Sequence, residues 1–204
     1  MPETPQSPGS GLIAQYLGAV GDALRGLDTA VLQAIADTCV SHCRAGAQLF
    51  ACGNGGSAAT ASHFIEDVAK GIQPQGRRRV RAIALTDSVP LLTAWANDTD
   101  YANIFAAQLD NLAEPGDLLL AISGSGNSPN IIRAVDCARE RQVHTIGLAG
   151  FGGGLLRQRA HQCLVVPSAN MQHVEDVHLV VTHLLYTYLK HALETVSDPN
   201  GKTV

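Results

Sequence analysis

The sequence predicts an α/β fold: one doubly wound domain with a five-stranded parallel sheet flanked by helices, preceded by an N-terminal helical pair. Five short segments are almost uniformly apolar, as in strands that are buried on both faces of a parallel sheet. Stretches with helical spacing separate them, and alternation of strand and helix is the pattern of βαβ units. Hydrophobic residues make up 46% of the chain and charged residues 16%, which is typical of a packed domain.

The expected elements follow in a regular order. Two helices are expected within residues 12–45, where apolar residues recur at helical spacing. Asp28 or Thr29 is the expected N-cap of the second helix, because both side chains accept hydrogen bonds from free backbone amides. The strands are predicted at residues 48–52, 80–86, 117–123, 143–149 and 162–168. The later helices are predicted at residues 57–70, 88–113 with a break, 127–141, 153–160 and 173–195.

Composition and charge limit the possible functions. The chain has 204 residues and a formal net charge of −4, so neither nucleic-acid nor membrane affinity is indicated. Residues 1–10 lack the basic and apolar regions of a secretory signal, and the most apolar C-terminal stretch is too short to span a bilayer. We therefore expect a cytoplasmic protein with one domain at residues 11–197 and tails at residues 1–10 and 198–204.

The five cysteines do not indicate a disulfide framework, because their number is odd and their spacing is irregular. Cys39 and Cys43 lie four residues apart on a predicted helix, with His42 between them. A metal site is one interpretation of this group. Two small core residues are the simpler one, since free cysteine is among the most buried residue types.

A serine-rich loop, "SGSGNS", joins the third predicted strand to a helix whose first turn contains Pro129. Backbone amides at a helix N-terminus favour an anion, and glycines let the backbone come close to it. The loop holds no lysine or arginine, so a phosphate bound by amides and hydroxyls is the expected ligand. A flexible turn with capping serines is the alternative. The residues predicted to contact the phosphate are Ser123, Gly124, Ser125 and Ser128.

A second loop, "CGNGGSA", follows the first predicted strand and contains the dinucleotide-binding spacing Gly53, Gly55 and Ala58. A dinucleotide-binding fold needs an acidic residue about 20 residues further on. The corresponding segment, residues 72–80, is basic and has no acid, and Asp87 comes too late. A nicotinamide cofactor is therefore not expected.

The order "CGNGGS", "SHF", "AND" and "ISGSGNSPN" resembles the SIS (sugar isomerase) domain family, and most closely its sedoheptulose 7-phosphate isomerases, the phosphoheptose isomerases. The resemblance covers nearly the whole chain. It implies an SIS-type fold, a phosphorylated heptose as substrate, and a serine-rich loop that binds the sugar phosphate. It also implies an aldose–ketose isomerisation, in which a base moves a proton between neighbouring carbons through an enediol.

The same resemblance implies one zinc ion per subunit, held in the family by His, Glu, Gln and His. The matching positions are His63, Asp67, Glu175 and His183, so two ligands differ in type, although all four remain competent zinc ligands. His63 and Asp67 lie four residues apart on one helix face. Glu175 and His183 lie eight residues apart, on roughly one side of the last helix. The alternative for His183, in its apolar surroundings, is a core histidine bonded to a carbonyl group.

By this resemblance we assign Asp67 as the catalytic base and His183 as its acid–base partner. Asn54, Gly55 and Ser57 are expected to contact the substrate, as is Glu175. Asp98 is also expected to contact sugar hydroxyls, and its alternative role is a helix or turn cap.

Two departures from the family pattern concern the phosphate. Gly124 replaces a residue that usually carries a hydroxyl group. Gly71 falls where the family has a basic residue, so the neighbouring Lys70 or the segment "RRRVR" is a candidate substitute, and a solvated loop is the simpler interpretation of that segment.

The resemblance further implies a homotetramer with active sites at subunit interfaces. Two other interpretations remain open: a non-catalytic SIS protein that binds a phosphosugar and a protein partner, and a metal-free enzyme acting on another phosphosugar. Loss of the ligand residues would be expected of a non-catalytic member, yet both histidines and both carboxylates are present.

Overall fold

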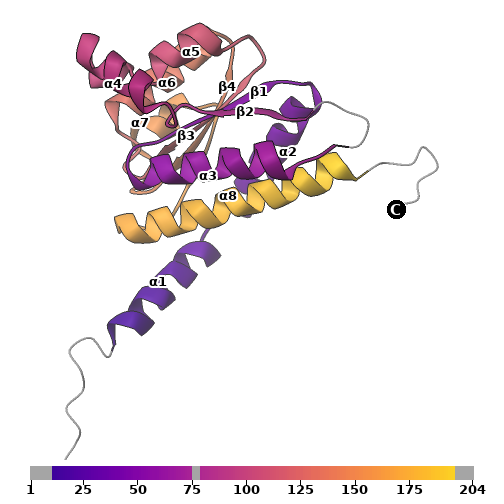
Figure 1. Cartoon of the computed structure of the whole chain (residues 1–204). Helices are drawn as coiled ribbons and strands as arrows, with labels where there is room; N and C mark the ends of the chain where they lie inside the picture. Colours follow the sequence, from indigo (N-terminus) through magenta and orange to yellow (C-terminus); the bar gives the residue numbers. More distant parts are fainter. Residues whose placement is uncertain (1–10, 75–78, 196–204) are drawn as a thin grey trace, which may run out of the picture.

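The computed structural model describes residues 11–74 and 79–195 and contains a five-stranded parallel sheet with helices on both faces (Figure 1). The strand order is β2-β1-β3-β4-β5. The strands are β1 (Gln48–Cys52), β2 (Arg81–Ala84), β3 (Leu118–Ser123), β4 (His144–Ala149) and β5 (Gln162–Val165). The predicted α/β class is therefore confirmed. The expected tails at residues 1–10 and 198–204 lie outside the described residues.

The two edge strands are shorter than the sequence predicts. β2 ends at Ala84 rather than residue 86, and β5 ends at Val165 rather than residue 168. Each edge strand pairs with one neighbour only. Pro167 has no backbone N–H for the sheet, which explains why the apolar run outlasts β5.

The helices account for the expected helical stretches. They are α1 (Leu12–Arg25), α2 (Thr29–Arg44), α3 (Gly56–Gly71), α4 (Val89–Asp98), α5 (Ala106–Leu112), α6 (Pro129–Glu140), α7 (Gly154–Arg159) and α8 (Met171–Glu194). Asp28 is the N-cap of α2, and its carboxylate accepts hydrogen bonds from two backbone amides at 3.0 Å. The expected break between α4 and α5 contains a short 3-10 helix, η1 (Tyr101–Asn103).

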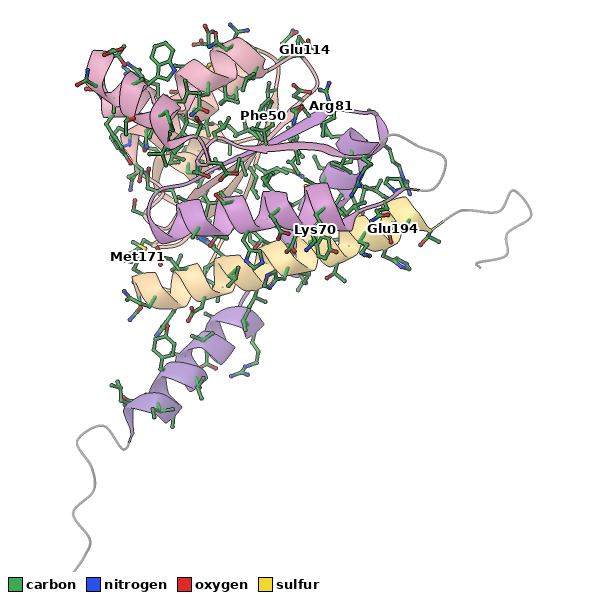
Figure 2. The ribbon with its side chains drawn as sticks, viewed as in Figure 1. Phe50, Lys70, Arg81, Glu114, Met171 and Glu194 are labelled. Carbon is green, nitrogen blue, oxygen red and sulfur yellow. The ribbon has the colours of Figure 1, made fainter. Side chains whose placement is uncertain are left out.

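Side chains alternate between the two faces of the sheet, so one strand contributes to two cores. Leu49 and Ala51 belong to the core beneath α2, α3 and α8. Phe50 and Cys52 belong to the core beneath α5, α6 and α7, and Phe50 lies fully buried near the middle of the sheet (Figure 2). In Figure 1, α3 and α8 run side by side below the sheet, while α4 to α7 lie above it.

The helix α1 packs on α8 and extends away from the sheet (Figure 1). Its attachment includes a hydrogen bond from the Tyr16 hydroxyl to the Asp176 carboxylate, at 2.6 Å. Its apolar residues Leu12, Ile13 and Leu17 are largely exposed. The first turns of this helix thus extend beyond the core, whereas Ala23 near its end is buried in the core shared with α2, α3 and α8.

The cysteine pair on α2 follows the simpler interpretation. Cys39 is buried in the core, and burial raises the pKa of the Cys43 thiol to about 11. The Nδ1 atom of His42 lies 2.8 Å from the carbonyl oxygen of Gly116. Within the described part of the chain all five thiols are free, and no helix is long and apolar enough to cross a membrane.

Candidate functional site

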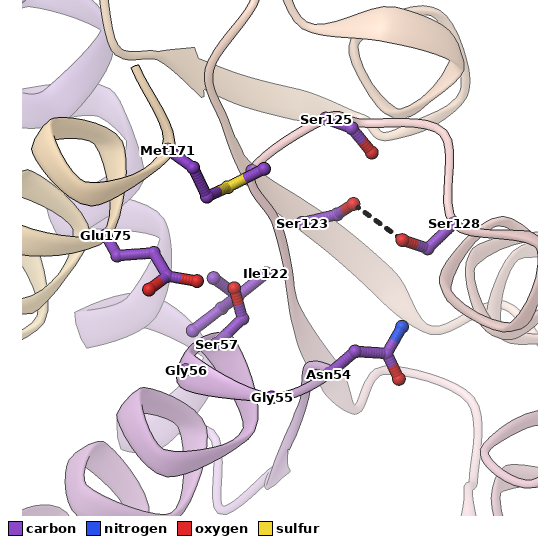
Figure 3. Close-up of a pocket in the computed structure, with 11 residues that line it drawn as sticks. Asn54, Gly55, Gly56, Ser57, Ile122, Ser123, Ser125, Ser128, Met171 and Glu175 are labelled. Atoms are coloured by element: carbon purple, nitrogen blue, oxygen red, sulfur yellow. Dashed lines mark hydrogen bonds between the residues drawn. The ribbon is translucent and has the colours of Figure 1, made fainter.

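A pocket of about 260 Å³ opens at the carboxyl ends of β1 and β3 (Figure 3). The chain leaves β1 toward β2 on one side and leaves β3 toward β4 on the other, so this is the topological switch point of the sheet. Ligands of open α/β sheets bind at such points. The lining residues are Asn54, Gly55, Gly56, Ser57, Ile122, Ser123, Gly124, Ser125, Ser128, Met171 and Glu175.

The loop between β3 and α6, here called the serine loop (residues 123–128), forms one wall of the pocket. The hydroxyl groups of Ser123 and Ser128 lie 3.3 Å apart and face each other (Figure 3). Ser128 is the N-cap residue of α6, but its side chain makes no capping hydrogen bond. The turn-and-cap interpretation therefore does not account for the Ser128 hydroxyl, which remains available to a ligand beside the positive end of α6.

The serine loop is held in place by the backbone of the next loop. Gly126 has a φ of +68°, and a methyl group added there would overlap the carbonyl group of Gly153. The carbonyl oxygen of Gly126 also accepts a hydrogen bond from the Leu156 amide, at 2.9 Å. Glycine is required here for both its conformation and its lack of a side chain.

The loop between β1 and α3 forms the opposite wall, and Glu175 of α8 approaches it closely. A methyl group added at Gly56 would overlap the Glu175 carboxylate. This carboxylate lies at the N-terminus of α3 and points toward Ser57, where the helix dipole favours negative charge (Figure 3). Glu175 is only partly buried and lines the pocket, so its carboxylate is open to a ligand.

A second group of candidate side chains begins further along α3. His63 Nε2 is 3.7 Å from Asp67 Oδ2, one turn away on the same helix. His183 comes from α8, and one ligand atom from each of the three residues lies within 4.8 Å of the others. We refer to His63, Asp67 and His183 as the metal triad. Two imidazoles and a carboxylate suit zinc, and three protein ligands leave one position open, as in catalytic zinc sites.

The structure does not bring Glu175 into the metal triad. Glu175 lies eight residues before His183, which is about 12 Å along the axis of α8. Of the four sequence-predicted ligands, the chain therefore gathers three in one place and directs the fourth to the pocket.

His183 is exposed at the surface between α3 and α8, so it is not a core histidine. The core histidine of this helix is His178, which is 1% exposed. Neither ring nitrogen of His178 has a hydrogen-bond partner among the described residues. Burial lowers the pKa of His178 from 6.5 to about 4, and the neighbouring backbone of Ala149 offsets only part of this effect.

Asp98 does not line the pocket. It is the last residue of α4, and its exposed carboxylate accepts a hydrogen bond from the Asn97 side chain at 2.8 Å. The remaining predicted substrate contacts all line the pocket: Asn54, Gly55, Ser57, Ser123, Gly124, Ser125, Ser128 and Glu175.

The basic candidates lie at the far end of α3. Lys70 is in the last turn, 3.5 Å from the Glu66 carboxylate, and lies toward the Glu194 end of α8 whereas Met171 marks the pocket end (Figure 2). Arg79 donates hydrogen bonds to the carbonyl groups of Ala69 and Lys70. These contacts hold the end of α3. Residues 77 and 78 of the predicted basic segment lie outside the described residues.

The structure adds pocket residues that the sequence analysis did not single out. Gly56 belongs to the glycine-rich run "CGNGGS", so the sequence already indicated that it lies in a candidate binding loop. Met171 gave none, because it reaches the serine loop only through the packing of α8, where its sulfur occupies the space that a side chain at Gly124 would need.

The sequence model of the SIS domain family matches residues 15–150 of the chain. The phosphoheptose isomerase of Akkermansia muciniphila is 38% identical over 154 residues, which cover 76% of this chain and 81% of that protein. The phosphoheptose isomerase of Mycobacterium tuberculosis is 42% identical over 161 residues, covering 79% and 82%. The solved structure of a phosphoheptose isomerase from Neisseria gonorrhoeae has a TM-score of 0.80 and 32% identity, covering 91% of this chain and 98% of that chain.

Proposed function

Because the chain belongs to the SIS domain family, and within it to the phosphoheptose isomerases, we propose that it converts sedoheptulose 7-phosphate to a glycero-manno-heptose 7-phosphate or an epimeric heptose 7-phosphate. The observation that carries this proposal is the serine-lined pocket at the switch point of the sheet. Its polar groups suit a phosphosugar, and the metal triad on α3 and α8 is proposed to supply acid–base groups.

The phosphate group is proposed to bind at the N-terminus of α6. Hydroxyl groups of Ser123, Ser125 and Ser128 donate to it, together with backbone amides of the serine loop. No lysine or arginine is among the lining residues, so the helix dipole and the amides offset the charge of the phosphate. The sugar hydroxyls are proposed to contact Asn54, Ser57 and Glu175. Asp98 does not line this pocket, and its contact with sugar hydroxyls stays a prediction.

The isomerisation moves a proton from C1 to C2 of the ketose. A base removes the proton from C1, an enediol forms, a proton returns to C2, and the hydroxyl proton of O1 passes to O2. We assign Asp67 as the base and His183 as its partner, because their ligand atoms lie within 4.8 Å of each other and can serve neighbouring atoms of one substrate.

The metal triad fits a divalent ion, because its nitrogen and oxygen atoms converge from two helices. A zinc ion held there by His63, Asp67 and His183 would polarise the substrate oxygens and stabilise enediolate charge. Asp67 has two carboxylate oxygens, so holding an ion with one does not prevent the other from accepting a proton. Glu175, which lines the pocket, is proposed to contact the sugar rather than the metal.

The decisive experiment incubates metal-free protein with sedoheptulose 7-phosphate, with and without zinc, and follows the product by NMR. We expect zinc-dependent turnover that is lost in His183→Ala. His191→Ala is the matched control, since it removes an exposed histidine from the same helix, two turns beyond the triad. Stereochemistry at C2 then identifies the heptose.

Other outcomes would favour the two remaining interpretations. Binding of the phosphosugar without turnover would indicate a non-catalytic SIS protein that acts through a protein partner. Turnover without dependence on zinc, and unaffected by His183→Ala, would indicate metal-free chemistry and would overturn the assigned roles of the triad.

A homotetramer in the cytoplasm is part of the proposal. The exposed apolar side chains of α1 (Leu12, Ile13 and Leu17) support an oligomer, because a surface of this kind is commonly covered by another subunit. The five free thiols agree with a reducing compartment. Sedimentation analysis of the chain, with Leu17→Glu as a variant, tests the oligomer.

A further inference from the structure

Asn54 and Asn130 form a reciprocal pair of amide hydrogen bonds across the pocket's two loops. Asn54 Nδ2 donates to Asn130 Oδ1 at 2.9 Å, and Asn130 Nδ2 donates to Asn54 Oδ1 at 2.8 Å. Asn54 precedes α3, whereas Asn130 lies in the first turn of α6 and is 1% exposed. The pair therefore joins the β1–α3 loop to the helix that follows the serine loop. The amide of Asn54 extends toward the Ser128 side of the pocket (Figure 3).

The direction of every hydrogen bond in this pair is determined by the backbone. The Ile131 amide donates to Asn130 Oδ1 at 3.0 Å, and a backbone N–H cannot accept. Asn130 Oδ1 is therefore the oxygen, so Asn54 must present its amino group to it and its own oxygen to Asn130 Nδ2. The Tyr101 hydroxyl, from η1, donates to the same Asn54 oxygen at 3.1 Å.

This arrangement leaves the Asn54 side chain with one free hydrogen-bond donor. A side-chain amide has two acceptor sites and two donor hydrogens. Both acceptor sites of Asn54 are used, by Asn130 and Tyr101, and one hydrogen is used by Asn130. One N–H remains, which can donate to a sugar or phosphate oxygen. Asn54 cannot accept a hydrogen bond from a sugar hydroxyl in this state.

We propose that Asn130 and Tyr101 are positioning residues for substrate recognition: they hold Asn54 as a single hydrogen-bond donor and connect the two walls of the pocket. The identity of the substrate rests on the proposed function, whereas the positioning role does not. Asn130 is 1% exposed, and removing one member of a hydrogen-bonded pair leaves the groups of the other member without their partner. Loss of either residue therefore frees Asn54 to rotate away from the orientation that the substrate needs.

The first test removes only the Tyr101 hydroxyl. Tyr101 is 59% exposed, so Tyr101→Phe should not affect folding. We expect kcat/KM for sedoheptulose 7-phosphate to fall about fivefold, which corresponds to one hydrogen bond of about 1 kcal/mol. The thermal midpoint and the affinity for inorganic phosphate should not change. Tyr188→Phe is the matched control, because its hydroxyl bonds Asp37 and Gln33 far from the pocket. Equal kinetics in Tyr101→Phe and wild type would overturn the role of Tyr101.

The second test is a double-mutant cycle with Asn54→Ala, Asn130→Ala and the double variant. Residues that act as one unit give non-additive effects. We expect the affinity of the double variant for sedoheptulose 7-phosphate to lie within about twofold of that of the weaker single variant. A loss in the double variant equal to the product of the two single losses would show that the residues act independently, and would overturn the proposed pair. If the wild type binds but does not isomerise this sugar, the proposed function fails while the cycle still decides the positioning role. If no sugar binds, the same cycle on the thermal midpoint decides whether the pair exists.

Discussion

The imidazole rings of His63 and His183 lie with their centroids 5.0 Å apart and their planes at 80°. One ring comes from α3 and the other from α8, so the metal triad exists only where these two helices are packed together. Each of His63→Ala and His183→Ala removes one of three ligands, so we expect zinc binding to weaken at least as much as on loss of an outer-shell partner, which is about 10–100-fold. Titration of metal-free protein by calorimetry measures this, with His191→Ala as the control.

The variant Glu175→Ala distinguishes substrate binding in the pocket from zinc binding at the metal triad. Because Glu175 lies in the pocket and outside the triad, we expect a larger loss of affinity for sedoheptulose 7-phosphate than for zinc. The same calorimeter measures both ligands. A loss of zinc affinity as large as that of His183→Ala would show that Glu175 is a metal ligand.

Gly126→Ala should disrupt the serine loop. The substitution combines a positive φ with overlap against the Gly153 backbone, which cannot move as a flexible side chain can. Gly46→Ala is the matched control, because Gly46 also has a positive φ, of +82°, but nothing within 4 Å of an added methyl group. We expect Gly126→Ala to lower stability by several kcal/mol and Gly46→Ala by about 1 kcal/mol. Urea unfolding compares them, and equal losses would contradict the close approach to Gly153.

Asp117→Asn should destabilise the sheet. The buried Asp117 carboxylate accepts hydrogen bonds from the backbone amides of Gln48 and Glu114, at 2.7 and 2.9 Å, and lies 3.7 Å from the Arg81 guanidinium. An amide group has only one acceptor oxygen, so one backbone N–H loses its partner and Arg81 loses its counter-charge.

We expect this substitution to lower the free energy of unfolding by about 2–4 kcal/mol. Asp110→Asn is the control, because it breaks the exposed ion pair with Arg141 and should cost much less. Urea unfolding of both variants at one pH gives the comparison. Similar losses in the two would show that Asp117 has no special structural role.

His178 should make the protein sensitive to acid. Its folded-state pKa of about 4 lies below the ordinary value of 6.5, so between these values the unfolded chain binds the extra proton. Its contribution to stability is complete above about pH 6.5 and is lost as the pH falls toward 4. We expect the loss between about pH 7.5 and pH 5 to be about 2 kcal/mol.

Two histidine variants isolate this contribution. In His178→Leu the pH dependence of the free energy of unfolding should shrink by about this amount. In His191→Leu, which removes an exposed histidine of the same helix, it should remain. An unchanged pH dependence in His178→Leu would mean that this ring finds a partner when protonated.

The parts of the fold that could be predicted depend on local pattern. The strands were recognisable because burial on both faces requires uniformly apolar runs, and the serine loop because glycine and serine follow such a run directly. His63 and Asp67 were recognisable together because four residues make about one helical turn.

The remaining features depend on packing between distant segments. Glu175 and His183 share one side of α8, but two turns separate them along its axis, so a shared side is not a shared site. Asp98 is the last residue of α4, so its position depends on the direction of that helix. Tertiary contacts set this direction, and the local sequence does not reveal it. Asn54 and Asn130 are 76 residues apart, and their pairing has no signature in either local sequence.

The helix α8 carries Met171 and Glu175 at the pocket, His178 in the core and His183 in the metal triad. A straight helix fixes both the distance and the angle between these groups. One residue inserted between His178 and His183 would turn everything beyond it by about 100°. The triad and the core contact could not then both be kept. Over evolutionary time, this helix can exchange side chains far more easily than it can change its length.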